Sequence, residues 1–160
     1  MMNYNTLKSN SFQFSIERIP ETIFRTTVVN LPNISVPAPM VPSAASNQWF
    51  PGSTSEFSPL DITFIVDENL KNYEEIYRWI TQQRYSIGDE FTPKNFTEDK
   101  LVSDAVLLTL TNASNPNRII KFYDLFPTSL SNITFTTQSA EPTPVECTAT
   151  FYYSRFVFVN

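Results

Sequence analysis

The stretch that most restricts the fold runs from Ile23 to Gly52, because it begins with a strand pattern and then becomes rich in proline. Four of its prolines lie at positions 32, 37, 39 and 42. Each one lacks a backbone N–H donor and fixes φ, so none suits the middle of a sheet and each favours extended neighbours. Residues 31–52 are therefore predicted to form an extended arm.

This arm carries large apolar side chains that a solvated linker of proline and serine does not need. They are Ile34, Val36, Met40, Val41, Trp49 and Phe50. Exposing this many apolar groups to water is unfavourable. We therefore expect another surface to cover them.

The composition predicts a single domain, residues 1–160, that is mainly β. Aromatic residues make up 14% of the chain and charged residues only 17%, a profile that suits strands better than helices. The single cysteine, Cys147, lies in an alternating apolar run, which indicates a buried residue rather than a reactive thiol. The sequence has no signal-peptide pattern at residues 1–10 and no apolar run long enough to span a membrane as a helix.

The residue types that are missing argue against an enzyme. There is no histidine, which excludes Ser/His/Asp and Cys/His catalytic groups as well as metal sites with imidazole ligands. Two glycines cannot form a phosphate-binding loop, and a net charge of −5 argues against a surface that binds nucleic acid. We expect no catalytic residue, cofactor or metal. A glycosidase-like pair of carboxylates from distant positions stays open.

Alternation of apolar and polar residues predicts the strands. Residues 12–16 and 23–30 are expected to pair as an antiparallel hairpin, and residues 104–111 and 118–126 as a second one. Further strands are predicted at residues 60–66, 133–137 and 145–158.

Apolar residues that recur three and four positions apart from Leu70 onward predict one amphipathic helix, which ends near Gln83. Trp79 is interpreted as a packing residue on this helix. Residues 84–102 have little periodicity and are predicted to form a long surface loop, and residues 1–10 a flexible N-terminus.

Four segments of the chain, in this order, carry a resemblance to a known family. They are Asn10–Ile16, Val28–Pro32, Leu60–Glu68 running into Tyr73–Trp79, and Lys121–Leu130. This succession resembles the tail tube proteins of contractile-tailed bacteriophages. In that family, a strand and an acidic turn precede the helix, and a Leu/Trp-Phe/Trp-Pro-Thr element precedes the next strand.

The resemblance implies an antiparallel β-sandwich or barrel of the phage tail tube type with one flanking α-helix. It also implies a virion structural protein of the tail that is assembled in the host cytoplasm. Its copies would form hexameric rings whose strands join across subunits. Stacked rings would make the inner tail tube through which DNA passes during ejection without specific binding. The implied partners are the tail sheath, the baseplate hub and the tape measure protein.

Baseplate hub proteins and the tube proteins of type VI secretion share this fold, so the place in the particle stays open. The arm prolines at 32, 37, 39 and 42 and the loop at 84–102 depart from the family pattern. Either feature fits a hub, a tube initiator or an adaptor ring as an alternative to the repeating tube.

Two groups of surface residues follow from this interpretation. Inter-subunit contacts are expected from Leu31, Val36, Met40, Val41, Trp49 and Phe50. Lumen-facing positions are expected at Gln13, Ser15, Glu17, Glu146, Thr148 and Thr150, because neutral or acidic walls do not retain phosphates. The alternative is that these six are the solvated face of a sandwich.

A β-sandwich binding module for carbohydrate or protein is a second hypothesis. In such a module, aromatic side chains would form a flat stacking platform. The residues available for it are Trp49, Trp79, Tyr152 and Tyr153.

Overall fold

A computed structural model describes residues 5–20, 25–43, 46–82, 101–138 and 143–159 of the chain. One helix, α1 (Lys71–Gln82), is found among them, and the other elements are strands. The strands are β1 (Phe12–Ile16), β2 (Thr26–Asn30), β3 (Ile34–Ser35), β4 (Met40–Pro42), β5 (Asn47–Trp49), β6 (Glu56–Phe57), β7 (Leu60–Ile65), β8 (Ser103–Leu110), β9 (Pro116–Leu130), β10 (Glu146–Tyr152) and β11 (Arg155–Val159). The predicted class, mainly β with one helix, is confirmed.

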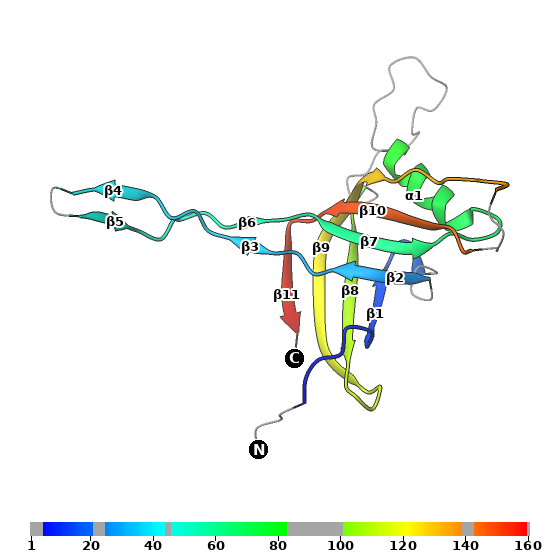
Figure 1. The fold of residues 1–160 in the computed structure, drawn as a ribbon, viewed down its shortest axis with the longest axis horizontal. Coiled ribbons are helices and arrows are strands. Elements are labelled where there is room, and N and C mark those ends of the chain that lie inside the picture. The colour runs from blue at the N-terminus through cyan, green and yellow to red at the C-terminus, as the bar shows by residue number, and fades with distance from the viewer. Residues whose placement is uncertain (1–4, 21–24, 44–45, 83–100, 139–142, 160) are drawn as a thin grey trace, which may run out of the picture.

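Seven antiparallel strands form the body of the protein in the order β1-β8-β9-β10-β7-β2, with β11 also paired to β9. Strands β1, β8, β9 and β11 run down the view in Figure 1, whereas β2, β7 and β10 run across it. We call these groups the β8 sheet and the β7 sheet. The long strand β9 belongs to both, because its first part pairs with β8 and β11 and its last part pairs with β10. The body is therefore a barrel-like sandwich of two crossed sheets.

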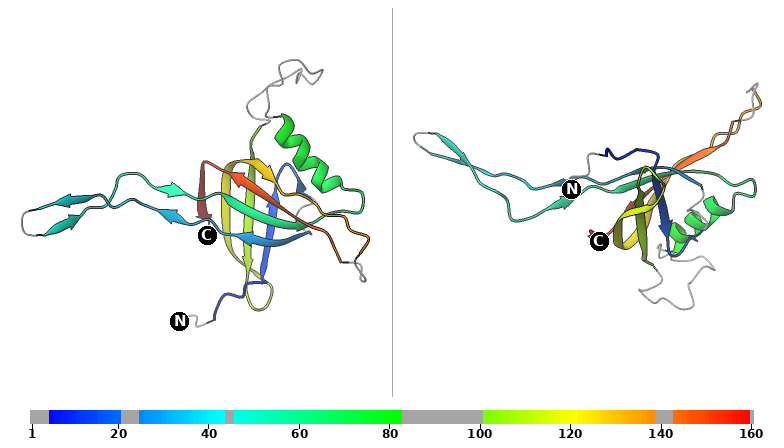
Figure 2. Two further views of the ribbon diagram at one scale, coloured as in Figure 1. Left: turned by 45° about the horizontal axis from the view of Figure 1, so that its top comes forward. Right: turned by 90° about the horizontal axis from the view of Figure 1, so that it is seen from below.

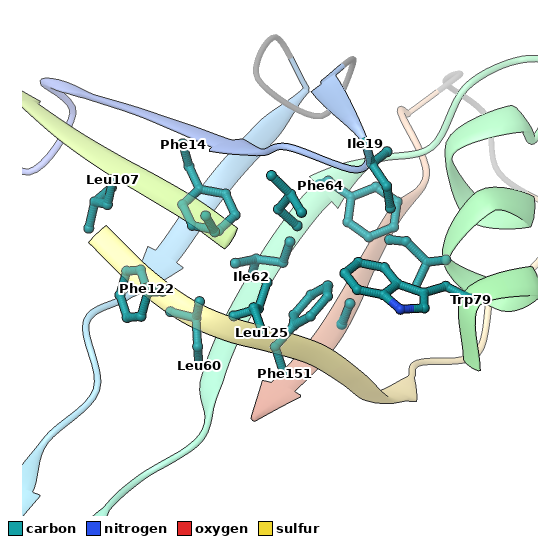
Figure 3. Packing of buried hydrophobic residues seen from close by; sticks show 14 of the residues in the cluster. Phe14, Ile19, Leu60, Ile62, Phe64, Trp79, Leu107, Phe122, Leu125 and Phe151 are labelled. Atoms are coloured by element: carbon teal, nitrogen blue, oxygen red, sulfur yellow. The ribbon is translucent and has the colours of Figure 1, made fainter. Parts of the chain in front are cut away.

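The two sheets enclose one hydrophobic core (Figure 3). Alternate residues of each strand point into it, as the period of a strand requires. On β10, for example, Cys147, Ala149 and Phe151 are buried while Glu146 and Tyr152 are exposed. The expected burial of Cys147 is thus confirmed. Other core side chains are Phe14, Ile16, Leu60, Ile62, Phe64, Leu107, Phe122 and Leu125.

Helix α1 covers one end of this core through Ile76 and Trp79 (Figure 2). Trp79 is 1% exposed, and its ring lies 6.0 Å from that of Phe151. Its Nε1–H donates to the carbonyl oxygen of Leu101 at 2.7 Å, and the guanidinium of Arg18 lies 4.9 Å from the ring centroid. Burial lowers the pKa of Arg18 from its ordinary value. The interpretation of Trp79 as a packing residue is confirmed.

Asn72 fixes the start of the helix against the end of β7. It is a buried polar residue, 3% exposed, and its hydrogen bonds are satisfied locally. Its Nδ2 donates to the Ile65 carbonyl at 2.8 Å, and its Oδ1 accepts from the backbone N–H groups of Asp67 and Tyr73. An unpaired amide at this depth would cost about 1–3 kcal/mol, so these contacts justify a polar residue in an apolar layer.

The strand predictions were confirmed in part. The second hairpin corresponds to β8 and β9, and residues 60–66 to β7. The first hairpin is wrong, because β1 pairs with β8 and β2 pairs with β7. A tight turn, in which Ile19 N–H donates to the Ile16 carbonyl and Ile19 is buried, leads the chain out of the β8 sheet.

The prediction of a strand at 133–137 is wrong, since residues 131–137 have no strand structure. β9 pairs with β10 only over Ala149–Tyr152, and beyond it Ser131 bonds to Thr148 through its N–H and its side-chain Oγ, so the ladder ends there. The single strand predicted at 145–158 is interrupted after Tyr152. At the break, Ser154 N–H donates to the Tyr123 carbonyl at 3.0 Å, and Asp124 has a φ of 54°. The expected flexible residues 1–4 and the expected loop residues 84–100 lie outside the described ranges.

Candidate assembly surfaces

The predicted arm is a protruding pair of antiparallel segments, residues 31–43 and 46–57, rather than a single extended segment. It projects from the barrel on the side away from α1 (Figures 1 and 2). Its base is the β3–β6 pair and its outer part the β4–β5 pair, in which Met40 lies opposite Trp49.

Proline is compatible with this ladder because it still accepts hydrogen bonds. The carbonyl of Pro39 accepts from Phe50 N–H at 3.1 Å, and that of Pro37 accepts from Gly52 N–H at 2.8 Å. Neither proline can donate in return, so each of these pairings has only one of the two usual hydrogen bonds. Proline was expected to exclude a sheet here. That expectation is wrong for Pro37 and Pro39, because their carbonyl groups still accept hydrogen bonds from the opposite segment.

Gly52 has a specific role in the arm. A Cβ atom at this position would lie 2.2 Å from the carbonyl oxygen of Pro37, far inside van der Waals contact. The atom in the way belongs to the backbone, which cannot move aside as a flexible side chain does. Only glycine therefore lets the two segments of the arm approach closely enough for the Gly52 N–H to donate to the Pro37 carbonyl.

All six residues expected at inter-subunit contacts lie on the arm or where it begins, and all are exposed in the isolated subunit. Trp49 is the most exposed of them at 68%, and Phe50 is 48% exposed. The others are Leu31, Val36, Met40 and Val41. Monomeric proteins rarely expose contiguous apolar surface on this scale outside contact sites.

The base of the arm is fixed to the barrel by aromatic contacts. The ring of Phe57 lies edge-on to Phe156 at 5.6 Å and to Tyr153 at 6.3 Å. The Tyr153 hydroxyl donates to the Ser58 carbonyl at 2.9 Å, and burial raises the pKa of this hydroxyl. The direction of the arm at its base is therefore set by the subunit itself.

The residues expected to face a lumen fall on two different surfaces. Gln13 and Ser15 lie on the outer face of β1, in the β8 sheet, and Glu17 directly follows that strand. Glu146, Thr148 and Thr150 lie on the outer face of β10, in the β7 sheet. If one of the two sheets lined a lumen, only the group of residues on that sheet would face it, and the other group would not.

The β10 set forms a polar row across the β7 sheet. Thr148 Oγ1 and Thr63 Oγ1 are 3.0 Å apart, and Thr150 Oγ1 donates to Asp61 Oδ1 at 2.7 Å. Thr27 Oγ1 lies 3.5 Å from Glu146 Oε1 at the limit of hydrogen bonding. The row is acidic, with no Lys or Arg among these residues.

Three strands of the body, as distinct from the arm, have one open edge within the described residues. β1 pairs only with β8, β2 only with β7, and β11 only with β9. Each edge presents unpaired backbone groups, which favour pairing with another chain. Sequence patterns did not reveal these edges, because alternation identifies a strand without identifying its neighbours.

The structure adds a charged cluster on the β8 sheet that sequence reasoning missed. The Tyr123 ring lies 4.7 Å from the Arg155 guanidinium and 5.0 Å from Lys121 Nζ. Lys121 Nζ is 3.3 Å from Asp104 Oδ2, and this hydrogen bond raises the pKa of Lys121. No short motif signals the cluster, since its members come from three strands.

The aromatic platform of the binding-module hypothesis is not formed. Trp79 is buried in the core, whereas Trp49 lies on the arm. The Tyr153 hydroxyl is bonded at the base of the arm, and the Tyr152 ring stacks on Phe126 instead. These four rings do not share a surface on which a sugar could lie.

The described ranges hold no candidate metal centre and no membrane-spanning helix. No group of three or more His, Cys, Asp or Glu residues there could hold a metal ion. No helix there is long and apolar enough to cross a membrane.

Comparison with curated proteins gives a family. The chain is 30% identical to the tail tube terminator protein of Enterobacteria phage T4 over 135 residues, which cover 80% of this chain and 73% of that protein. The chain belongs to the contractile tail tube protein family. A structural role related to the tail tube follows from this membership. Models of protein families, searched separately, give no match.

Solved structures support the fold of this tail tube family member. A chain in the baseplate of the anti-feeding prophage superimposes with a TM-score of 0.70 at 10% identity, covering 99% of this chain and 97% of that one. A chain in the sheath/tube terminator of an extracellular contractile injection system gives a TM-score of 0.68 at 17% identity and covers 98% of each chain. The predicted tail-tube type of β fold with a flanking helix is thereby confirmed.

Proposed function

We propose that this protein forms a ring that terminates the tube of a contractile tail. The observation that carries the proposal is its 30% identity to a tail tube terminator over most of both chains. A terminating ring differs from the repeating inner-tube ring that was expected from the sequence. The tube is then the structure to which the ring binds.

The surface of the subunit supports self-association. Large apolar side chains on the arm are exposed in the isolated subunit, with Trp49 at 68% and Val41 at 51%. Their contact with water is unfavourable, so a partner surface that covers them would stabilise an assembly.

Open strand edges offer a route to ring closure. Strands β1, β8, β9 and β11 alternate in direction, so β11 of one subunit beside β1 of the next would continue the β8 sheet in antiparallel order. Six such junctions would close a hexamer and leave no open edge in that sheet. The same contact on every subunit is the head-to-tail type that forms closed rings.

A terminator differs from a tube protein in the contacts that its ring makes after it has formed. Tube rings must stack on copies of themselves, whereas a terminator ring must bind the tube on one face and stop growth on the other. We infer tube and sheath as its partners, with DNA passing through the ring. The net charge of −5 suits a passage that does not retain phosphates.

Sedimentation velocity and negative-stain imaging of the purified protein test this proposal. The expected species has the mass of six 18.4 kDa chains and forms rings that do not stack into tubes. Added to growing tubes of the tail tube protein from the same particle, it should stop their elongation. Long tubes made by the protein alone would support the repeating-tube role instead, and a monomer at every concentration would contradict ring formation.

A further inference from the structure

A line of charged side chains, which we call the charged row, crosses the β8 sheet on the face away from the core. Glu17 N–H donates to the Asp104 carbonyl at 3.0 Å, which places these two residues side by side at the end of β1. Asp104 Oδ2 lies 3.3 Å from Lys121 Nζ on β9. Lys121 Nζ and the Arg155 guanidinium lie 5.0 Å and 4.7 Å from the centroid of the Tyr123 ring. The charged row therefore begins with acidic groups at the β1 edge and ends with a basic group at the β11 edge.

The two ends of the charged row are available to another chain. Glu17 and Arg155 are both exposed, and neither forms a salt bridge within the described residues. Within one subunit their backbones are three strand spacings apart, about 14 Å, and the Lys121–Asp104 pair lies between them. The acidic end of one row complements the basic end of the row in a second copy. The partner that fits this surface is therefore the chain itself.

The two edges also match in length and in level. β1 and β11 have five residues each and lie at opposite edges of the β8 sheet (Figure 1). Ala105 on β8 pairs with Ile16 on one side and with Phe122 on the other. Phe122 in turn pairs with Phe156, so β1 and β11 are level with each other in the sheet. An aligned junction between copies would run along the whole of β11 and set the two ends of the charged row opposite each other.

The third open edge of the body, that of β2, is less suited to a junction. The β1–β8 and β11–β9 ladders each keep one register over five residue pairs, whereas the β2–β7 ladder shifts its register between Thr26 and Val28. Thr27 is the extra residue there, and its hydroxyl donates to the Thr63 carbonyl at 3.3 Å. A bulge in an edge strand opposes pairing with a further chain. The regular edges of the body are thus the two edges of the β8 sheet.

We propose that Arg155 of one copy forms a salt bridge with Glu17 of the next copy, which fixes the register of the β11–β1 junction. This inference rests on the ring assembly proposed above and adds the contact that selects one register. A shift by two residues, the smallest that keeps each side chain on its face, would separate the two charges. One exposed salt bridge contributes little, but this one recurs at every junction of the ring.

Two charge-reversal variants test the inference. Glu17→Arg gives the charged row a positive charge at both ends, and Arg155→Glu gives it a negative charge at both ends. Copies of either variant alone repel each other at every junction, so the midpoint concentration of ring formation should rise roughly 2- to 30-fold in low salt. An equal mixture of the two variants should form rings in which they alternate, because every junction then joins opposite charges. Sedimentation velocity compares the three samples, and thermal unfolding of each dilute variant checks that it folds.

Glu146→Arg is the matched control for Glu17→Arg. It makes the same change of charge on β10, which pairs on both sides with β7 and β9 and forms no edge of the sheet. Its midpoint of ring formation should stay that of the wild type.

A Glu17→Cys, Arg155→Cys double variant tests the register without any charge. Facing residues of antiparallel strands have Cα atoms about 4.5 to 5.5 Å apart, which suits a disulfide. Mild oxidation of the assembled variant should therefore link neighbours into a series of bands that ends at six chains on a denaturing gel. The only native cysteine, Cys147, is 1% exposed and should not interfere.

The expected result is rescue of ring formation in the mixture. If wild-type rings form but the mixture assembles no better than either variant alone, the contact between Arg155 and Glu17 is overturned and ring formation stands. Oxidised rings of the double variant that yield single chains alone would overturn the register in the same way. A wild-type protein that never assembles would overturn the proposed function, and this inference with it.

Discussion

Replacing Trp49 and Phe50 by serine should weaken assembly without unfolding the subunit. The two side chains are 68% and 48% exposed, so folding of the isolated chain covers only part of each. Full burial of a large apolar side chain contributes about 1.5 to 3 kcal/mol. Scaled by the exposed fractions, the two contacts contribute about 1.7 to 3.5 kcal/mol to assembly. The dissociation constant of the contact should therefore rise roughly 15- to 300-fold.

The assay has two arms, one for assembly and one for folding. Sedimentation velocity over a concentration series gives the midpoint of ring formation, and thermal unfolding of the dilute subunit gives its stability. A Trp79→Ser variant is the matched control, because Trp79 is 1% exposed and lies in the core. Truncating a buried aromatic residue costs about 3 to 5 kcal/mol of folding stability. This control should lower the melting temperature, and the arm variant should not.

Two results would refute the reasoning. If the arm variant unfolds at a clearly lower temperature than the wild type, the arm belongs to the core of its own subunit. If the midpoint of ring formation does not change, the exposed apolar side chains do not contribute to assembly, and the surface argument for the arm fails.

Three further changes give measurable outcomes. Gly52→Ala should distort the arm, because its Cβ would meet the Pro37 carbonyl at 2.2 Å, so assembly should weaken while the melting temperature of the subunit stays the same. Trp79→Phe should leave the Leu101 carbonyl without its donor and lower the free energy of unfolding by about 1 to 3 kcal/mol in urea titrations. Burial raises the pKa of Tyr153 above its ordinary 10.0, so the associated stability is complete below pH 10 and is lost as pH rises through the folded-state pKa. Tyr153→Phe should therefore flatten the decline of melting temperature above pH 10.

Local patterns predicted the elements that depend on neighbouring residues. Alternation identified β7 and the β8–β9 hairpin, whose turn at 111–115 is short and polar. Spacing of three and four identified α1. The same alternation could not show that β1 pairs with β8, almost ninety positions later in the chain, because strand pairing is decided by tertiary packing.

Residue preferences gave a wrong prediction of the backbone structure of the arm. Four prolines argued against any sheet, yet Pro37 and Pro39 take part in a ladder through their carbonyl groups alone. All the predicted contact residues are exposed in the subunit, and their contact with other subunits stays a prediction. The pairing of Met40 with Trp49 across the arm could be recognised only in the structure.

The position of β10 has a consequence for how the chain folds. In the order β1-β8-β9-β10-β7-β2, this strand makes the only strand pairing of the described residues that joins β7 and β2 to the rest of the body. Its residues, Glu146–Tyr152, come after all of those strands in the chain. During synthesis, β7 and β2 must wait for a strand that leaves the ribosome long after them, and pairings this distant in sequence form slowly. Until β10 has been synthesised, the apolar arm between β2 and β7 is exposed on a barrel that has not yet closed. We therefore expect the nascent chain to be most prone to aggregation just before its last strands are synthesised.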